Sequence, residues 1–133
     1  MYLLDTNACI AILNQRSSTL ISTLRSKRAD EILLCSIVKA ELAYGAHRSQ
    51  YPEKNLQTLG LFFSQFDSIP FDDRAVDAYG RIRAELSKRG QLIGPMDLMI
   101  AAIAFAHDLT LITRNVREFE RIAGLKIENW HDL

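Results

Sequence analysis

The alternation of short apolar runs with helical stretches is the feature that most constrains the fold of this chain. Apolar runs bounded by polar residues lie at residues 2–4, 31–35, 68–71, 109–113 and 126–130. Strands that alternate with helices in this order predict a mainly parallel central sheet flanked by helices on both faces. We therefore expect an α/β fold.

The stretches between these runs place apolar residues at helical spacing. Helices are expected near residues 8–13, 18–24, 37–49, 52–66, 72–90, 98–107 and 116–122. Thr6 or Asn7 is expected to cap the first of them, because short polar side chains satisfy free backbone N–H groups at helix starts.

The length of the chain allows one ordinary domain, and we assign residues 1–133 to it. Hydrophobic residues make up 48% of the chain, enough for a packed core without disulfide or metal staples. Cys9 and Cys35 both lie in apolar stretches, so we interpret them as reduced core residues rather than as a disulfide or metal pair.

The charge balance bears on partners and location. Sixteen Lys and Arg residues match sixteen Asp and Glu residues, which excludes a globally basic nucleic-acid coat but allows a local patch. The longest uncharged apolar run, residues 98–106, is far shorter than the ~20 residues that span a bilayer. With no basic leader at the N-terminus, a cytoplasmic protein without membrane association is expected.

Polar side chains follow three of the predicted strands at the point where each strand ends. Asp5 and Thr6 follow the first strand, and Thr113 ends the fourth. Ser36 follows the second strand, with Glu41 just inside the next helix. Because ligands of parallel sheets bind outside the carboxyl ends of the strands, we expect these side chains to converge.

Each acid also has a purely structural interpretation. Asp5 and Asp97 could cap helices, and Glu41 could pair with a Lys or Arg on the inward face of its helix. Glu118 and Glu120 lie among arginines and could belong to a solvated, salt-bridged helix. Their joint placement at one edge of the sheet favours a functional site.

Clustered carboxylates suit a hard divalent cation, because oxygen ligands select Mg²⁺ or Mn²⁺ rather than Zn²⁺. His47, His107 and His131 show no metal-ligand spacing and are expected on the surface. The sequence contains neither a GxxxxGK[ST] phosphate loop nor a nucleophile elbow. A carboxylate-held ion fits phosphoryl or phosphodiester chemistry.

Four segments in the same order carry a family resemblance: residues 5–7, 36–45, 94–102 and 113–119. They resemble the PIN-domain ribonucleases and, more narrowly, the VapC-type toxins of type II toxin–antitoxin pairs. With the closing residues 128–130, the resemblance covers essentially the whole chain. It implies a PIN-like domain and a Mg²⁺- or Mn²⁺-dependent endoribonuclease. Such an enzyme cleaves tRNA or other loop or single-stranded RNA by metal-activated water and inhibits translation.

The resemblance also implies roles for individual residues. The implied catalytic and metal-binding acids are Asp5, Glu41, Asp97 and Glu118. The implied supporting polar residues are Thr6, Asn7, Ser36, Thr113 and Asn115. Many PIN domains carry an acid where this chain has Asn115, so whether Glu118, Glu120 or Asn115 completes the site stays open.

Several partners are implied as well. A VapB-type antitoxin would lay a helix in a groove of the toxin, and operator DNA would be bound only through that antitoxin. A homodimer is expected by family analogy. Apolar side chains that could face the antitoxin, although we interpret them as core residues, are Ile10, Leu13, Ile21 and Leu24. Basic side chains that could attract RNA are Arg16, Arg25, Lys27, Arg28, Lys39 and Arg48.

Two other functional classes are considered. A haloacid-dehalogenase-like phosphatase needs a second Asp two residues after Asp5, where this chain has Asn7. A catalytically silent PIN-like domain that binds RNA or protein is favoured only by Asn115. Measured metal binding would separate a silent domain from a nuclease.

Overall fold

The computed structural model describes residues 1–131 and confirms an α/β fold. The elements are β1 (Tyr2–Leu4), α1 (Thr6–Leu13), α2 (Ser18–Arg25), the 3₁₀ turn η1 (Ala29–Glu31), β2 (Ile32–Cys35), α3 (Ser36–His47), α4 (Pro52–Phe63), β3 (Asp67–Ile69), α5 (Asp73–Lys88), α6 (Pro95–Ala106), β4 (Thr110–Ile112), α7 (Val116–Phe119) and β5 (Ile127–Glu128). None of the helices in this part of the chain is both long enough and apolar enough to cross a membrane.

The five strands form one sheet in the order β3-β2-β1-β4-β5, and every neighbouring pair is parallel. Leu3 of the central strand β1 lies opposite Leu33 of β2 and Leu111 of β4. The strands expected to deliver polar residues, β1, β2 and β4, are therefore adjacent. Their carboxyl ends meet at one edge of the sheet, as the sequence predicted.

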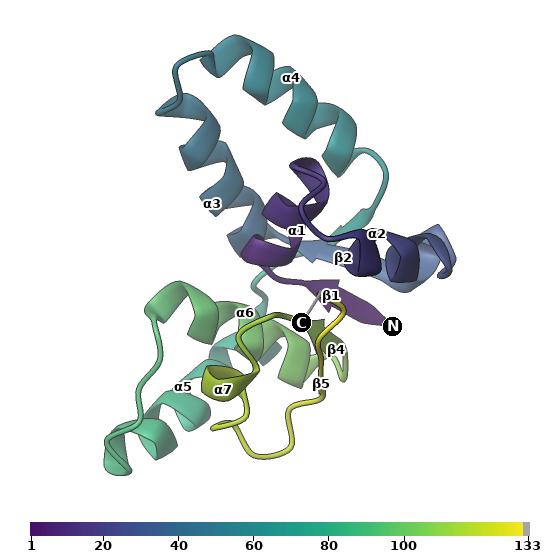
Figure 1. The fold of residues 1–133 in the computed structure, drawn as a ribbon. Helices are drawn as coiled ribbons and strands as arrows, with labels where there is room; N and C mark the ends of the chain where they lie inside the picture. Colours follow the sequence, from purple (N-terminus) through teal and green to yellow (C-terminus); the bar gives the residue numbers. More distant parts are fainter. Residues whose placement is uncertain (132–133) are drawn as a thin grey trace.

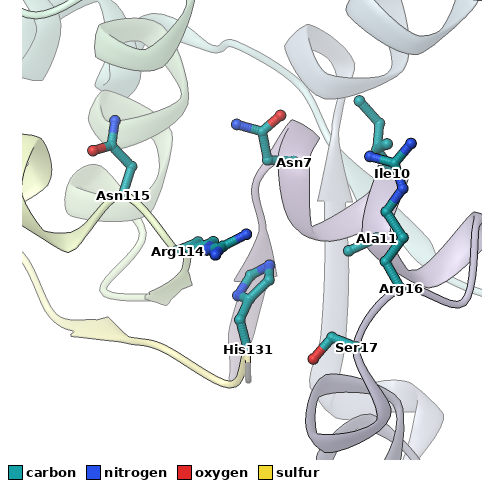
Figure 2. A pocket seen from close by; sticks show the side chains of 8 residues that line it. All are labelled: Asn7, Ile10, Ala11, Arg16, Ser17, Arg114, Asn115 and His131. Carbon is teal, nitrogen blue, oxygen red and sulfur yellow. The ribbon is translucent and has the colours of Figure 1, made fainter. Parts of the chain in front are cut away.

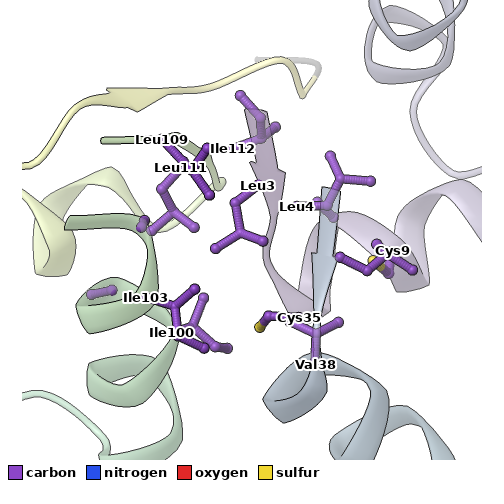
Figure 3. Close-up of a cluster of buried hydrophobic side chains, with 14 of the residues drawn as sticks. Leu3, Leu4, Cys9, Cys35, Val38, Ile100, Ile103, Leu109, Leu111 and Ile112 are labelled. Carbon is purple, nitrogen blue, oxygen red and sulfur yellow. The ribbon is translucent and has the colours of Figure 1, made fainter. Parts of the chain in front are cut away.

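Helices cover both faces of the sheet, with α1, α3 and α4 on one side and α5, α6 and α7 on the other (Figure 1). Side chains of β1 alternate between these layers. Leu3 points toward Ile100 and Ile103 of α6, whereas Leu4 points toward Cys9 of α1 (Figure 3). Because both faces of β1 are buried, the residue that follows it is held at a fixed place in the core.

Both cysteines are free and buried, in agreement with the interpretation from the sequence. Pro70 follows the edge strand β3 directly, where the missing N–H of proline removes no ladder hydrogen bond.

The first helix begins one residue earlier than a cap at Thr6 or Asn7 requires, so that expectation was wrong. Asp5 is the N-cap, and its side chain accepts a hydrogen bond from the N–H of Ala8 at 2.8 Å. The physical reason is that β1 ends at Leu4, so the chain turns into α1 through a single extended residue.

Three other helices differ from the expected bounds by three residues at one end, and one of them is α4, which ends at Phe63 rather than at residue 66. Helix α6 begins at Pro95, which is favourable because proline has no N–H to leave unsatisfied in the first turn. Asp97 consequently lies inside the first turn of α6 rather than before it. Helix α7 ends at Phe119, three residues before the expected end at residue 122.

The end of α5 depends on Gly90, whose φ of +64° lies in the left-handed region. Its N–H and that of Gln91 close the helix on the carbonyls of Ser87 and Leu86. We expect Gly90→Ala to lower the free energy of unfolding by about 1 kcal/mol, because the space around it is open and only the backbone conformation opposes a side chain.

Denaturant unfolding measures this effect, and Gly60→Ala is the matched control. Gly60 lies within α4 with open space around it, so alanine there is expected to stabilise the protein by about 0.5 kcal/mol. Equal effects of the two substitutions would contradict the assigned role of Gly90.

Candidate active site

Asp5 is the most buried acid of the site, with only 3% of its surface exposed. Its carboxylate accepts hydrogen bonds from the Ala8 N–H and from the Thr113 hydroxyl. The pKa of Asp5 is raised to about 6, mainly by burial; the charges of Asp97 and Glu41 add to the rise, and the two hydrogen bonds oppose it. The carboxyl end of β1 thus carries an acid that is costly to ionise unless a positive charge is nearby.

Glu41 reaches this acid from α3. It is half-buried, and its Oε1 accepts a hydrogen bond from the Thr6 hydroxyl at 2.5 Å. Within residues 1–131, no Lys or Arg forms an ion pair with Glu41, so the structural interpretation of this acid as one half of a salt bridge does not hold. Thr6 instead holds the carboxylate toward the start of α1.

Asp97 joins the same cluster from the first turn of α6. Burial raises its pKa above the ordinary value, and the charges of Glu41 and Glu118 raise it further. Glu118 is half-buried on α7, whereas Glu120 is exposed and does not contribute to the shift of Asp97. The structure therefore places Glu118, and not Glu120, beside the other acids.

The smaller polar residues lie in three different environments. Thr113 is fully buried, and its hydroxyl accepts a hydrogen bond from the Asn115 N–H at 2.9 Å while it donates to Asp5. Asn7 and Asn115 line one pocket, and each lies two residues after Asp5 or Thr113 in the sequence. Ser36 is exposed at the start of α3 and forms no hydrogen bond to an acid in the described part of the chain, so its role stays a prediction.

Thr113 is expected to hold both Asp5 and the turn into α7. Thr113→Val would leave the Asn115 N–H without its acceptor and remove the donor to Asp5, so we expect a loss of about 1–3 kcal/mol in the free energy of unfolding. The pKa of Asp5 should rise further, because the opposing hydrogen bond is lost. Denaturant unfolding and titration followed by NMR measure the two effects. Thr113→Ser keeps the hydroxyl and should behave like the parent; equal losses for Val and Ser would contradict this role.

The donor set fits a hydrated Mg²⁺ or Mn²⁺ ion. Asp5, Glu41, Asp97 and Glu118 offer carboxylate oxygens, which suit hard cations. In residues 1–131, no three His, Cys, Asp or Glu side chains lie close enough to enclose an ion by themselves. Mg²⁺ commonly keeps several waters and uses only one or two carboxylates. Acids that are near enough to raise one another's pKa can therefore bind the ion partly through its waters.

A pocket of about 540 Å³ lies between the start of α1 and the turn that leads into α7, on two segments that also carry Asp5 and Thr113 (Figure 2). It is lined by Asn7, Ile10, Ala11, Arg16, Ser17, Arg114, Asn115 and His131. Arg114 was not among the basic residues expected to attract RNA, although its position directly after the strand-end Thr113 was a usable signal. His131 was expected on the surface and is only 8% exposed, because its N–H and its ring Nδ1 both contact the side-chain oxygen of Asn129.

A second groove of about 300 Å³ is bounded by α1, α3 and α4. Half-buried Ile10 and Leu13 and buried Leu42 and Leu59 form its apolar wall, and Glu41 lies on its lining. Ile10 and Leu13 pack on the core, as interpreted from the sequence, and they also line this groove. Ile21 and Leu24 line a different depression with α2.

Known proteins match this chain over nearly its whole length. The PIN domain family matches residues 2–125. Ribonuclease VapC2 of Haemophilus influenzae is 40% identical over 129 residues, 97% of each chain, and the tRNA(fMet)-specific endonuclease VapC of Shigella flexneri is 38% identical over 97% of each. A crystal structure of VapBC2 from Rickettsia felis, bound to a DNA fragment from its promoter, superposes with a TM-score of 0.90 at 39% identity, covering 97% of this chain and 98% of that one. The chain therefore belongs to the PIN domain family and, within it, to the VapC proteins.

Proposed function

We propose that this chain is a Mg²⁺- or Mn²⁺-dependent endoribonuclease toxin that cleaves tRNA in the cytoplasm and thereby inhibits translation. The observation that carries the proposal is the convergence of Asp5, Glu41 and Asp97 at the carboxyl ends of adjacent parallel strands, with Glu118 beside them. The endonuclease activity named for similar VapC proteins supports tRNA as the substrate class.

The acids of this chain would act as the holders of the ion. Asp5 and Asp97 would bind it, and Glu41 and Glu118 would complete its surroundings directly or through water. When bound, a divalent cation of this kind lowers the pKa of water and offsets the charge that develops on the attacked phosphate. Thr113 keeps Asp5 oriented by its hydrogen bond.

Thr6 performs the corresponding task for Glu41, whose carboxylate it fixes against the start of α1. Both hydroxyls sit on the carboxyl side of a strand, so the orientation of the acids depends on the sheet itself. This preorganisation keeps the acids in place before RNA arrives, which reduces the reorganisation needed during the reaction.

A VapB-type antitoxin is the proposed partner, docked by a helix in the groove between α1, α3 and α4. The apolar wall of this groove suits one face of an amphipathic helix, and Glu41 offers an acceptor for a basic side chain of the antitoxin. Solved relatives are VapB–VapC complexes, some of them bound to DNA, which supports operator binding through the antitoxin. A homodimer remains part of the proposal by family analogy.

The test is cleavage of total tRNA by antitoxin-free protein, with Mg²⁺ or with EDTA. We expect discrete fragments with Mg²⁺ only, and a loss of at least about 100-fold in rate for Asp97→Asn, because it removes a charged ligand. Asp67→Asn makes the same chemical change at an exposed residue of β3 and should leave the rate unchanged.

The other outcomes are distinct. Cleavage that persists both in EDTA and in Asp97→Asn would contradict a metal-dependent site at these acids. Cleavage of another RNA but not of tRNA would show that the substrate is wrong and that the endoribonuclease activity is right. Folded protein that cleaves no RNA would favour the catalytically silent domain, and calorimetric titration with Mg²⁺ would then show whether the acids bind an ion.

A further inference from the structure

Two arginines from separate segments line the pocket that also contains Asn7 and Asn115. Arg16 lies in the connection between α1 and α2, and Arg114 lies between β4 and α7. Figure 2 shows their side chains on opposite sides of the pocket, with Asn7 between them. The fold thus brings together two cationic groups that lie far apart in the sequence.

Within residues 1–131, neither guanidinium group is paired with a carboxylate. Among residues 1–131, Arg16 and Arg114 form no ion pair and no side-chain hydrogen bond, whereas Arg28, Arg81 and Arg89 each pair with a carboxylate. Both side chains are exposed to solvent at the pocket. Two unpaired cations lining one concave, polar surface indicate an anionic ligand.

The position of the pocket identifies that ligand. Asn7 and Asn115 line it and also link it to the acids: Asn7 follows Asp5 by two residues, and the Asn115 N–H is hydrogen-bonded to Thr113, which holds Asp5. A chain of phosphates whose scissile bond lies at the acids would therefore extend its neighbouring phosphates into this pocket. Carboxylates repel such a chain, so cations beside them are needed to hold it.

We propose that Arg16 and Arg114 form a clamp that binds backbone phosphates of the RNA strand next to the scissile bond. The proposal rests on the proposed ribonuclease function and assigns the substrate-binding part of the same site. The planar guanidinium donates two parallel hydrogen bonds to phosphate oxygens, which suits binding without a choice of base. The side-chain amides of Asn7 and Asn115 supply further donors on the same surface.

The experiment measures RNA binding apart from cleavage. In an Asp97→Asn background with EDTA, fluorescence anisotropy follows a labelled 12-nucleotide single-stranded RNA of mixed sequence over a range of salt concentrations. We expect Arg16→Ala and Arg114→Ala each to weaken binding about tenfold. Each should also reduce the dependence of log K on log salt concentration by about 0.7, the value for one lost phosphate contact on a single strand.

Arg83→Ala is the matched control, because Arg83 is an exposed arginine of α5 outside the pocket. It removes the same charge and should change affinity by less than about twofold. Affinity and salt slope that stay unchanged in Arg16→Ala and Arg114→Ala overturn the clamp, as does an equal loss in Arg83→Ala, since net charge alone would then explain binding.

Cleavage of tRNA by the unsubstituted chain, measured in parallel, separates this proposal from the proposed function. If the chain cleaves tRNA but the arginine variants bind RNA normally, the clamp is wrong and the ribonuclease stands. If the chain cleaves no RNA but both variants lose binding as described, the two arginines bind RNA phosphates, whereas the ribonuclease function and the position of the clamp next to a scissile bond are wrong.

Discussion

Asp5→Asn is expected to abolish RNA cleavage and, in metal-free buffer at neutral pH, to make the folded protein more stable. Cleavage should fall at least about 100-fold, because the substitution removes a charged metal ligand. Asparagine keeps an oxygen that accepts the Ala8 N–H, so the cap of α1 is retained. What disappears is the cost of ionising a buried carboxyl group beside two other acids.

The pH dependence follows from the raised pKa of Asp5, which is 3.8 ordinarily and about 6 in the folded protein. Between these values the folded state binds more protons than the unfolded state, so stability falls as the pH rises through this window. Above about pH 6, ionised Asp5 lowers the free energy of unfolding by the full amount, about 3 kcal/mol. Below about pH 3.8 the carboxyl group is protonated in both states, and this destabilisation is absent.

Denaturant unfolding from pH 4 to pH 8 in EDTA measures this contribution. The parent and Asp5→Asn should have nearly equal stability at about pH 4 and diverge up to about pH 6, with the variant more stable above it. Added Mg²⁺ should close the gap by stabilising only the parent. Asp67→Asn, at an exposed position, should show neither effect. If Asp5→Asn is less stable than the parent at pH 7.5 in EDTA, ionised Asp5 does not destabilise the metal-free protein and the prediction is wrong.

Leu3→Ala is expected to have the largest effect on stability, a loss of about 3–5 kcal/mol in the free energy of unfolding. Leu3 is 0% exposed in the central strand, between β2 and β4 and against α6 (Figure 3). Removing its methyl groups leaves a cavity between the sheet and α6 that rigid neighbouring strands fill poorly. Chemical denaturation of the purified variant measures the loss.

Leu61→Ala is the matched control, since Leu61 is 71% exposed on α4 and the same atoms are removed. Its effect should stay within about 0.5 kcal/mol. A cost below 1 kcal/mol for Leu3→Ala would mean that the layer between β1 and α6 is loosely packed. It would also weaken the claim that β1 holds Asp5 in a fixed place.

Taken together, the two substitutions separate stability from function along one strand. Leu3 stabilises the strand, whereas Asp5, two residues later, destabilises the metal-free fold when it is ionised. A site that gathers several carboxylates carries such a cost, which packing elsewhere must offset. The buried Thr113 reduces it locally by donating to Asp5.

Much of the fold could be predicted from the sequence because it depends on local signals. Apolar runs that end in polar residues located β1, β2 and β4, and helical spacing located the helices between them. The parallel arrangement follows, since strands joined through helices return in the same direction. The predicted convergence of Asp5, Glu41 and Asp97 depends on that topology alone, and their mutual electrostatic effects agree with it.

The tertiary structure alone decided what depends on contacts between distant segments. The bond from Thr6 to Glu41 and the grouping of Glu118, rather than Glu120, with Asp97 need the packing of separate helices. The placement of Arg16 and Arg114 around one pocket likewise depends on how distant segments pack. Sequence patterns report which way a residue faces within its own element, whereas the distance between two elements is set by how their side chains pack, and that is a property of the whole core.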